Sequence, residues 1–162
     1  MSSGSLLAIA ISPDAKQPLE TVNEVEALPG KGLRGDRYAE VKGAFQSGGE
    51  IKPSQEVSLI EAEAIEAVVR DYDLEISHAD TRRNLLTSGV ALNHLVGKTF
   101  QIGEVTLRGV KLCEPCSYLE SLTCEGIEQA LKHRGGLRAQ IVSGGTIRVG
   151  DAIAASPGTA DT

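Results

Sequence analysis

Short runs of apolar or alternating residues recur along the chain and are separated by glycine-containing turns, a pattern typical of β-strands joined by tight turns. Residues 13–29 are an exception, because they show no clean period. Hairpins are predicted at 99–112 and at 139–149, where two runs flank a glycine turn. The predicted strands are Leu6–Ile11, Val57–Ile60, Leu85–Thr87, Thr99–Ile102, Val105–Leu112, Ala139–Val142, Thr146–Val149 and Ala152–Ala154.

One stretch has instead the period of an amphipathic helix. Between Glu61 and Asp71, apolar residues recur at three- and four-residue steps and form a single stripe. Glutamates lie near its start and Arg70 near its end, as the helix dipole favours. Residues 91–96 are predicted to form one or two helical turns, 124–132 a second helix, and 77–81 a polar loop.

Many short strands and few helices indicate a β-rich α+β fold, a barrel or sandwich with short inserted helices. Regular helices do not separate the strands, so a doubly wound parallel sheet is disfavoured. The chain of 162 residues is long enough for one domain with its own core. We expect that domain to span residues 6–154, with disordered ends at 1–5 and 155–162.

The composition narrows the range of functions. Aromatic residues make up only 3% of the chain and tryptophan is absent, which disfavours a stacking platform for nucleic acid or carbohydrate. No apolar run approaches 18 residues, and the N-terminus does not resemble a signal peptide. With an odd count of three cysteines, these features predict a reduced, cytoplasmic protein without membrane association.

Charge is distributed unevenly along the chain. Residues 1–80 hold 7 Lys/Arg against 15 Asp/Glu, whereas residues 81–150 hold 9 against 5. The net charge of −6 should repel nucleic acid. The basic second half could still bind a small anion, although most of these charges are expected to be solvated.

Two thiols lie three residues apart in the segment Cys113-Glu114-Pro115-Cys116, directly after a predicted strand. A redox dithiol normally lies at a helix N-terminus in a βαβ context, which is absent here. A structural zinc site would recruit Cys124 and His133 as well, but the spacing fits no established zinc pattern. Proline ends a strand and exposes the next residue, so a single functional thiol at Cys116 fits this segment better than a redox pair or a zinc site. From the spacing alone, an inert buried cysteine is nevertheless more common than a functional one.

Basic segments with glycine or asparagine provide candidate anion sites, because arginine binds phosphate in a bidentate manner and glycine permits close backbone approach. For each segment taken singly, surface ion pairing with the acidic first half is the more common role. The three histidines have no partner that the sequence can place, so a Cys–His hydrolase is disfavoured. The candidate binding residues are Arg34, Arg37, Arg82, Arg83, Asn84, Arg134 and Gly135.

Several separate motifs occur in a consistent order. They are G-L-R-G-D-R at 32–37, V-S-L-I at 57–60, R-R-N-L-L at 82–86, L-V-G-K-T-F-Q-I-G at 95–103, C-E-P-C at 113–116, R-G-G-L-R-A-Q-I-V at 134–142 and G-T-I-R-V-G-D at 145–151. Over roughly residues 6–153 the chain resembles the MOSC domain, the module at the C-terminus of molybdenum cofactor sulfurases.

The resemblance implies a MOSC-like β-barrel with a working cysteine that carries sulfur or ligates the molybdenum of a pterin cofactor. The proline–cysteine step gives that role to Cys116. Arg82 and Asn84 match the R-x-N step that contributes to phosphate binding in relatives, and Arg83 between them leaves open which arginine points inward. Pyridoxal phosphate is a family association only, since the sequence has no aminotransferase-like domain. It also lacks the extra N-terminal β-region of some molybdenum reductases.

Three functions follow as hypotheses. The first is a molybdenum-cofactor module in which Cys116 ligates the metal, and which either carries the cofactor or reduces N-hydroxylated substrates with electrons from a separate redox partner. The second is a sulfur carrier in which Cys116 accepts a persulfide from a cysteine desulfurase. The third is a non-catalytic domain with a structural zinc ion at the four ligands named above, which the spacing disfavours.

Overall fold

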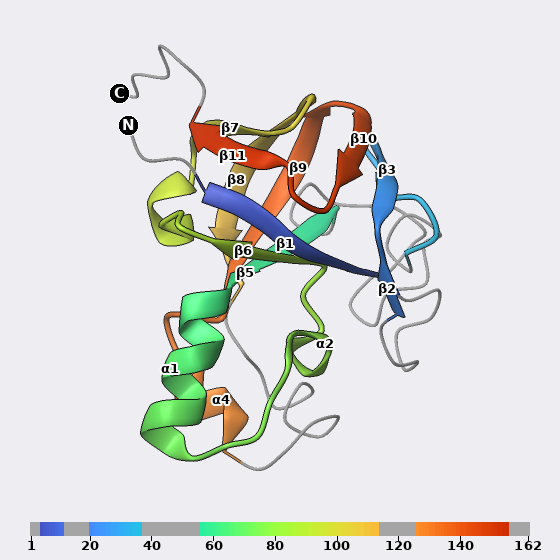
Figure 1. Cartoon of the computed structure of the whole chain (residues 1–162). Coiled ribbons are helices and arrows are strands. Elements are labelled where there is room, and N and C mark those ends of the chain that lie inside the picture. The colour runs from blue at the N-terminus through green and yellow to red at the C-terminus, as the bar shows by residue number, and fades with distance from the viewer. Residues whose placement is uncertain (1–3, 12–19, 37–55, 114–125, 156–162) are drawn as a thin grey trace, which may run out of the picture.

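A computed structural model describes residues 4–11, 20–36, 56–113 and 126–155 of the chain (Figure 1). The strands are β1 (Gly4–Ile11), β2 (Glu20–Val22), β3 (Glu24–Leu28), β4 (Gly32–Leu33), β5 (Val57–Glu61), β6 (Leu85–Ser88), β7 (Thr99–Ile102), β8 (Val105–Leu112), β9 (Leu137–Ser143), β10 (Gly145–Arg148) and β11 (Ala152–Ala155). The helices are α1 (Ala62–Tyr72), α2 (His78–Thr81), α4 (Ile127–Ala130) and the 3-10 turn η2 (Leu92–Leu95).

A closed ring of strands forms the body of the protein. The order around it is β1, β11, β7, β8, β9, β5 and β6, and β6 pairs with β1 to close the ring. All neighbours are antiparallel except β5 and β6, which run parallel, so the barrel is mixed. Strand β2 extends the sheet beside β1, while β10, β3 and β4 form a separate small sheet. The predicted β-rich barrel with short inserted helices is therefore confirmed.

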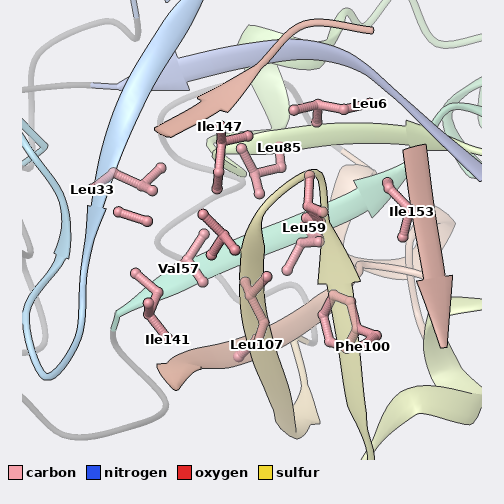
Figure 2. Packing of buried hydrophobic residues seen from close by; sticks show 14 of the residues in the cluster. Leu6, Leu33, Val57, Leu59, Leu85, Phe100, Leu107, Ile141, Ile147 and Ile153 are labelled. Atoms are coloured by element: carbon pink, nitrogen blue, oxygen red, sulfur yellow. The ribbon is translucent and has the colours of Figure 1, made fainter. Parts of the chain in front are cut away.

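Apolar side chains from all seven ring strands fill the barrel (Figure 2). The alternation predicted for strands is plain in β8, where Val105 and Leu107 are buried and Arg108 is exposed. Phe100 is the largest fully buried side chain among the described residues. Each fully buried large apolar side chain contributes about 1.5–3 kcal/mol to folding, so this cluster is the main source of stability.

A second apolar cluster lies outside the barrel, where α1 and α4 pack beside β5 and β6 (Figure 1). Its buried members include Ile60 of β5, Val68 of α1 and Ile127 of α4. The start of α1 is tied to the first residue of η2 and to the chain before it, because the Glu61 carboxylate accepts from the Leu92 amide and the Glu63 carboxylate from the Gly89 amide. The helix predicted from periodicity is thus confirmed, displaced by one residue.

The hairpin predicted at 139–149 is wrong. Strand β9 is flanked by β5 and β8 inside the ring, so it has no free edge for β10. Strand β10 pairs instead with β3, in the register Gly145↔Ala27 to Arg148↔Glu24. The partner of β10 thus comes from the region in which the sequence showed no period.

Smaller differences occur at the ends of other elements. Strand β1 begins at Gly4, so residues 4 and 5 belong to the barrel rather than to a terminal extension. The segment expected to be a polar loop contains the short helix α2. In the predicted second helix, α4 begins only at Ile127, and 124–125 lie outside the described residues. No helix in the described ranges combines the length and apolar character needed to cross a membrane.

Candidate functional site

The side chain of Arg83 joins three of the motifs identified in the sequence. Its Nε donates to the carbonyl of Gly135 at 2.7 Å, and its Nη2 donates to the carbonyl of Cys113 at 2.8 Å. The Cys113 amide in turn donates to the Gly136 carbonyl at 2.8 Å. The R-R-N step, the start of the C-E-P-C segment and the R-G-G turn therefore meet at one point.

A compact turn presents Arg83 to this point. The Thr81 hydroxyl donates to the His78 carbonyl at 2.6 Å and accepts from the Arg83 amide at 3.3 Å. Arg82 has a φ of 60°, a left-handed conformation that costs a non-glycine residue about 1–2 kcal/mol. The hydrogen bonds around Thr81 offset part of this cost, and the turn aims Arg83 inward.

Gly136 allows the R-G-G turn to approach strand β5 closely. Its φ of 117° is in the left-handed region, and a methyl group on it would overlap the carbonyl oxygen of Leu59. No other residue type combines this φ with so close an approach to β5. The second glycine of R-G-G is therefore required by packing, and its position brings the Gly135 carbonyl within reach of Arg83.

The charge of Arg83 lies inside the protein. The residue is 6% exposed, and its third bond runs from Nη1 to the Thr81 carbonyl at 3.2 Å. Among the described residues it is paired with carbonyl groups rather than with a carboxylate. Because a guanidinium stays charged at any physiological pH, this leaves a positive charge that no described acid cancels.

His78 also contacts this turn. Its Nε2 lies 2.8 Å from the Arg83 carbonyl, and since a carbonyl only accepts, Nε2 carries the proton. Burial lowers the pKa of His78, against a smaller opposing effect of that hydrogen bond. The imidazole is therefore neutral at pH 7 and adds no second positive charge beside Arg83.

Asn84 is used entirely within the fold. Its Oδ1 accepts from the amide and hydroxyl of Ser58 at 3.1 and 3.2 Å, and its Nδ2 donates to the Ala10 carbonyl at 3.0 Å. These bonds tie the chain before β6 to β5 and β1. Between the two arginines, Arg83 is the buried one and Arg82 is half-buried, which answers the question left open by the sequence.

The side chains of Arg34 and Arg134 make contacts of their own. Arg34 is exposed and pairs with Glu26 at 2.8 Å. Arg134 donates to the Ala130 carbonyl at 2.8 Å and lies 5.8 Å from the ring centroid of Tyr72. The predicted residues Arg37 and Cys116 lie outside the described ranges.

The four predicted zinc ligands do not form a site within the described residues. Cys113 is buried and His133 is exposed, while Cys116 and Cys124 lie outside the described ranges. Within those ranges, no three His, Cys, Asp or Glu side chains gather to hold a metal ion.

One buried acid was not predicted from the sequence. Glu56, directly before β5, accepts from the amides of Ile141 at 2.8 Å and Gly30 at 3.3 Å. Burial raises the pKa of Glu56, and the two hydrogen bonds partly oppose that rise. A lone carboxylate before an apolar strand gives no sequence signal. Thr81 was likewise missed, because it is one polar residue of a predicted loop.

Solved structures share this fold. The YUAD protein from Bacillus subtilis matches with a TM-score of 0.75 at 18% identity, over 94% of either chain. YiiM from Geobacillus stearothermophilus matches with a TM-score of 0.71 at 11% identity, over 98% of this chain and 77% of that one. YiiM from Escherichia coli matches with a TM-score of 0.64 at 17% identity, over 94% and 69%.

Sequence comparison supplies the family. No curated protein matches the chain. The model of the MOSC domain matches residues 46–154, which is more than half of the chain and includes the three segments that meet at Arg83. The chain therefore belongs to the MOSC domain family.

Proposed function

We propose that this MOSC domain binds a molybdenum–pterin cofactor, with the thiolate of Cys116 as a ligand to the metal. One observation carries the proposal: a buried arginine whose charge no described acid cancels is bonded to the backbone from which the C-E-P-C segment continues. Cys116 is three residues beyond Cys113, so the covalent geometry of the chain keeps the Cα atoms of Cys113 and Cys116 within about 11 Å of each other.

The chemistry of these groups suits an anionic cofactor with a soft metal site. Thiolate is a soft ligand, and a nearby cation favours the thiolate over the thiol. The half-buried Arg82 and the backbone of the R-G-G turn would hold the phosphate of the cofactor. Arg83 and Asn84 would support these groups from within the fold, since their polar atoms are bonded to the protein.

The reaction proposed for such a site is reduction of an N-hydroxylated compound. One N–O bond breaks, two electrons and two protons are consumed, and an amine and water are released. The cofactor, when bound, supplies the two-electron redox centre, and a separate redox protein supplies the electrons. The part of this chain is to bind the cofactor and to keep the working thiol deprotonated.

The test is metal and pterin analysis of the purified protein. We expect protein from cells that make the cofactor to contain molybdenum and pterin in equal amounts. Cys116→Ser should lose most of the molybdenum, whereas Cys113→Ala should retain it, because Cys113 contributes only its backbone to the contacts described above. Wild-type protein that contains neither component would contradict the proposal.

The same buried cation also favours a second function, persulfide transfer. A sulfur carrier needs a reactive thiolate but no metal, and a thiolate attacks the persulfide of a cysteine desulfurase more readily than a thiol does. The transfer moves one sulfur atom onto Cys116, and the desulfurase thiolate leaves. Incubation with a desulfurase and cysteine should then add the mass of one sulfur atom to the wild type and not to Cys116→Ser. If the wild type gains no mass, this function is excluded.

A further inference from the structure

We infer that Arg83 is a positioning residue for the cysteine-bearing segment: it acts on backbone carbonyl groups and does not itself bind the cofactor. The inference concerns how the chain leaves β8 at Cys113. Its effect on activity rests on the proposed function, because that function assigns the working thiol to Cys116, in the segment that begins at Cys113. The local geometry, however, can be tested without any cofactor.

The planar guanidinium of Arg83 bridges two chain segments, the end of β8 and the turn before β9. Nε and Nη2 form one edge of the guanidinium, and they bind the carbonyls of Gly135 and Cys113. The Cys113 amide also donates to the Gly136 carbonyl. Both peptide groups that flank the Cys113 Cα are thus held, and the guanidinium sets the distance between β8 and the turn before β9.

A third hydrogen bond links the Arg83 guanidinium to the turn that precedes Arg83 in the chain. Nη1 binds the Thr81 carbonyl, and the Thr81 hydroxyl holds the Arg83 amide. With three donors bound to carbonyls in a 6% exposed position, the guanidinium is committed to the backbone. Lysine at this position would keep the charge but not the arrangement, because an ammonium group cannot present a planar edge to two carbonyls.

Cys113 provides a direct probe of this contact. It is 1% exposed, so a thiol reagent reaches it only when the segment opens. In a Cys116→Ser/Cys124→Ser background it is the single remaining thiol. We would measure its labelling rate by iodoacetamide in that background, without urea and at low urea concentrations. Local opening exposes little surface and responds weakly to urea, whereas global unfolding responds steeply.

Three substitutions in this background separate positioning from general stability. Arg83→Lys should raise the labelling rate without urea about tenfold or more, since about 1.4 kcal/mol of lost hydrogen bonding corresponds to a factor of ten. That faster rate should depend weakly on urea. Thr81→Val, which removes two hydrogen bonds at similar volume, should show a smaller rise of the same kind. Ile102→Ala, a barrel substitution on β7, should label only through urea-dependent global unfolding.

Molybdenum bound per folded chain gives the functional readout with all cysteines present. Arg83→Lys should lower it more than Ile102→Ala does, although both reduce stability. The inference is overturned if Arg83→Lys labels at the background rate, or if its labelling follows urea as that of Ile102→Ala does. If Arg83→Lys does not fold, an unchanged rate in Thr81→Val overturns it. Wild-type protein without molybdenum would defeat the proposed function, and the labelling rates would still decide the positioning role.

Discussion

Two arginine-containing turns of this protein carry the same residue type in opposite surroundings. At 32–36, Arg34 is largely exposed, with 64% of its side chain accessible, and pairs with Glu26 across the small sheet. At 81–84, Arg83 is 6% exposed and binds three carbonyls. The sequence proposed both as anion sites on equal grounds. Their surroundings show that one charge is shared with an acid and solvent, while the other is committed to the backbone.

The difference arises from the chain around each arginine. The Arg34 amide and side chain both bind Glu26, so the residue stays on the β3–β4 surface. Arg83 follows a left-handed residue and a threonine-bridged turn that direct it inward. Exposed ion pairs contribute little to stability, whereas removing a buried charged partner costs several kcal/mol. Substitutions in the two turns should therefore have very different effects.

The largest expected effect is that of Arg83→Met. It leaves three carbonyl groups in a buried region without their partner, and we expect a loss of about 3–5 kcal/mol in the free energy of unfolding. Urea denaturation followed by circular dichroism measures this loss. A loss below about 1 kcal/mol would mean that the contacts of Arg83 are as weak as those of an exposed pair.

Two glycines extend the comparison to the backbone. Gly136→Ala should cost about 2–4 kcal/mol, because it combines a left-handed φ with overlap on the Leu59 carbonyl. Gly35→Ala is the matched control: its φ is 88°, but among the described residues the added methyl would meet only Ile11 Cδ1, at 3.4 Å. It should cost about 1–2 kcal/mol, the backbone term alone. Equal losses in urea denaturation would contradict the tight approach assigned to Gly136.

His78 should make the buried turn sensitive to pH. Its pKa in the folded protein is lowered by burial, so below its ordinary value of about 6.5 the unfolded chain binds the proton first. Stability is therefore lost as pH falls from about 6.5 toward the lowered pKa. His78→Gln keeps an N–H donor without the titration, and its free energy of unfolding should fall less than that of the wild type between pH 7 and 5. Parallel pH curves for the two proteins would exclude this contribution.

The smallest expected effect belongs to the exposed turn. Arg34→Gln should lower stability by about 0–1 kcal/mol at low salt, and the difference should shrink at 1 M salt because the pair is screened. Denaturation of both proteins at two salt concentrations measures this. A loss that persists at high salt would show that Arg34 contributes more than an ion pair and would weaken the contrast with Arg83.

The sequence predicted most of the barrel because period-two alternation reports a strand with one buried face, as in β8. It did not predict the pairing of β10 with β3, since strand partners depend on which edges the closed ring leaves free. Helix α2 has only four residues, too few for a period to show. At the site, the motifs marked the correct segments, but neither the positive φ of Arg82 nor the burial of Arg83 is visible in the residue order R-R-N.

The most direct test of this account compares molybdenum bound per folded chain in wild type, Arg83→Lys and Arg34→Lys, all purified from cells that make the cofactor. Both substitutions keep the charge, so only the planar hydrogen bonding of the guanidinium is removed. The account predicts that the wild type binds molybdenum and that Arg83→Lys loses far more of it than Arg34→Lys. A larger loss in Arg34→Lys, or wild-type protein without molybdenum, would contradict it.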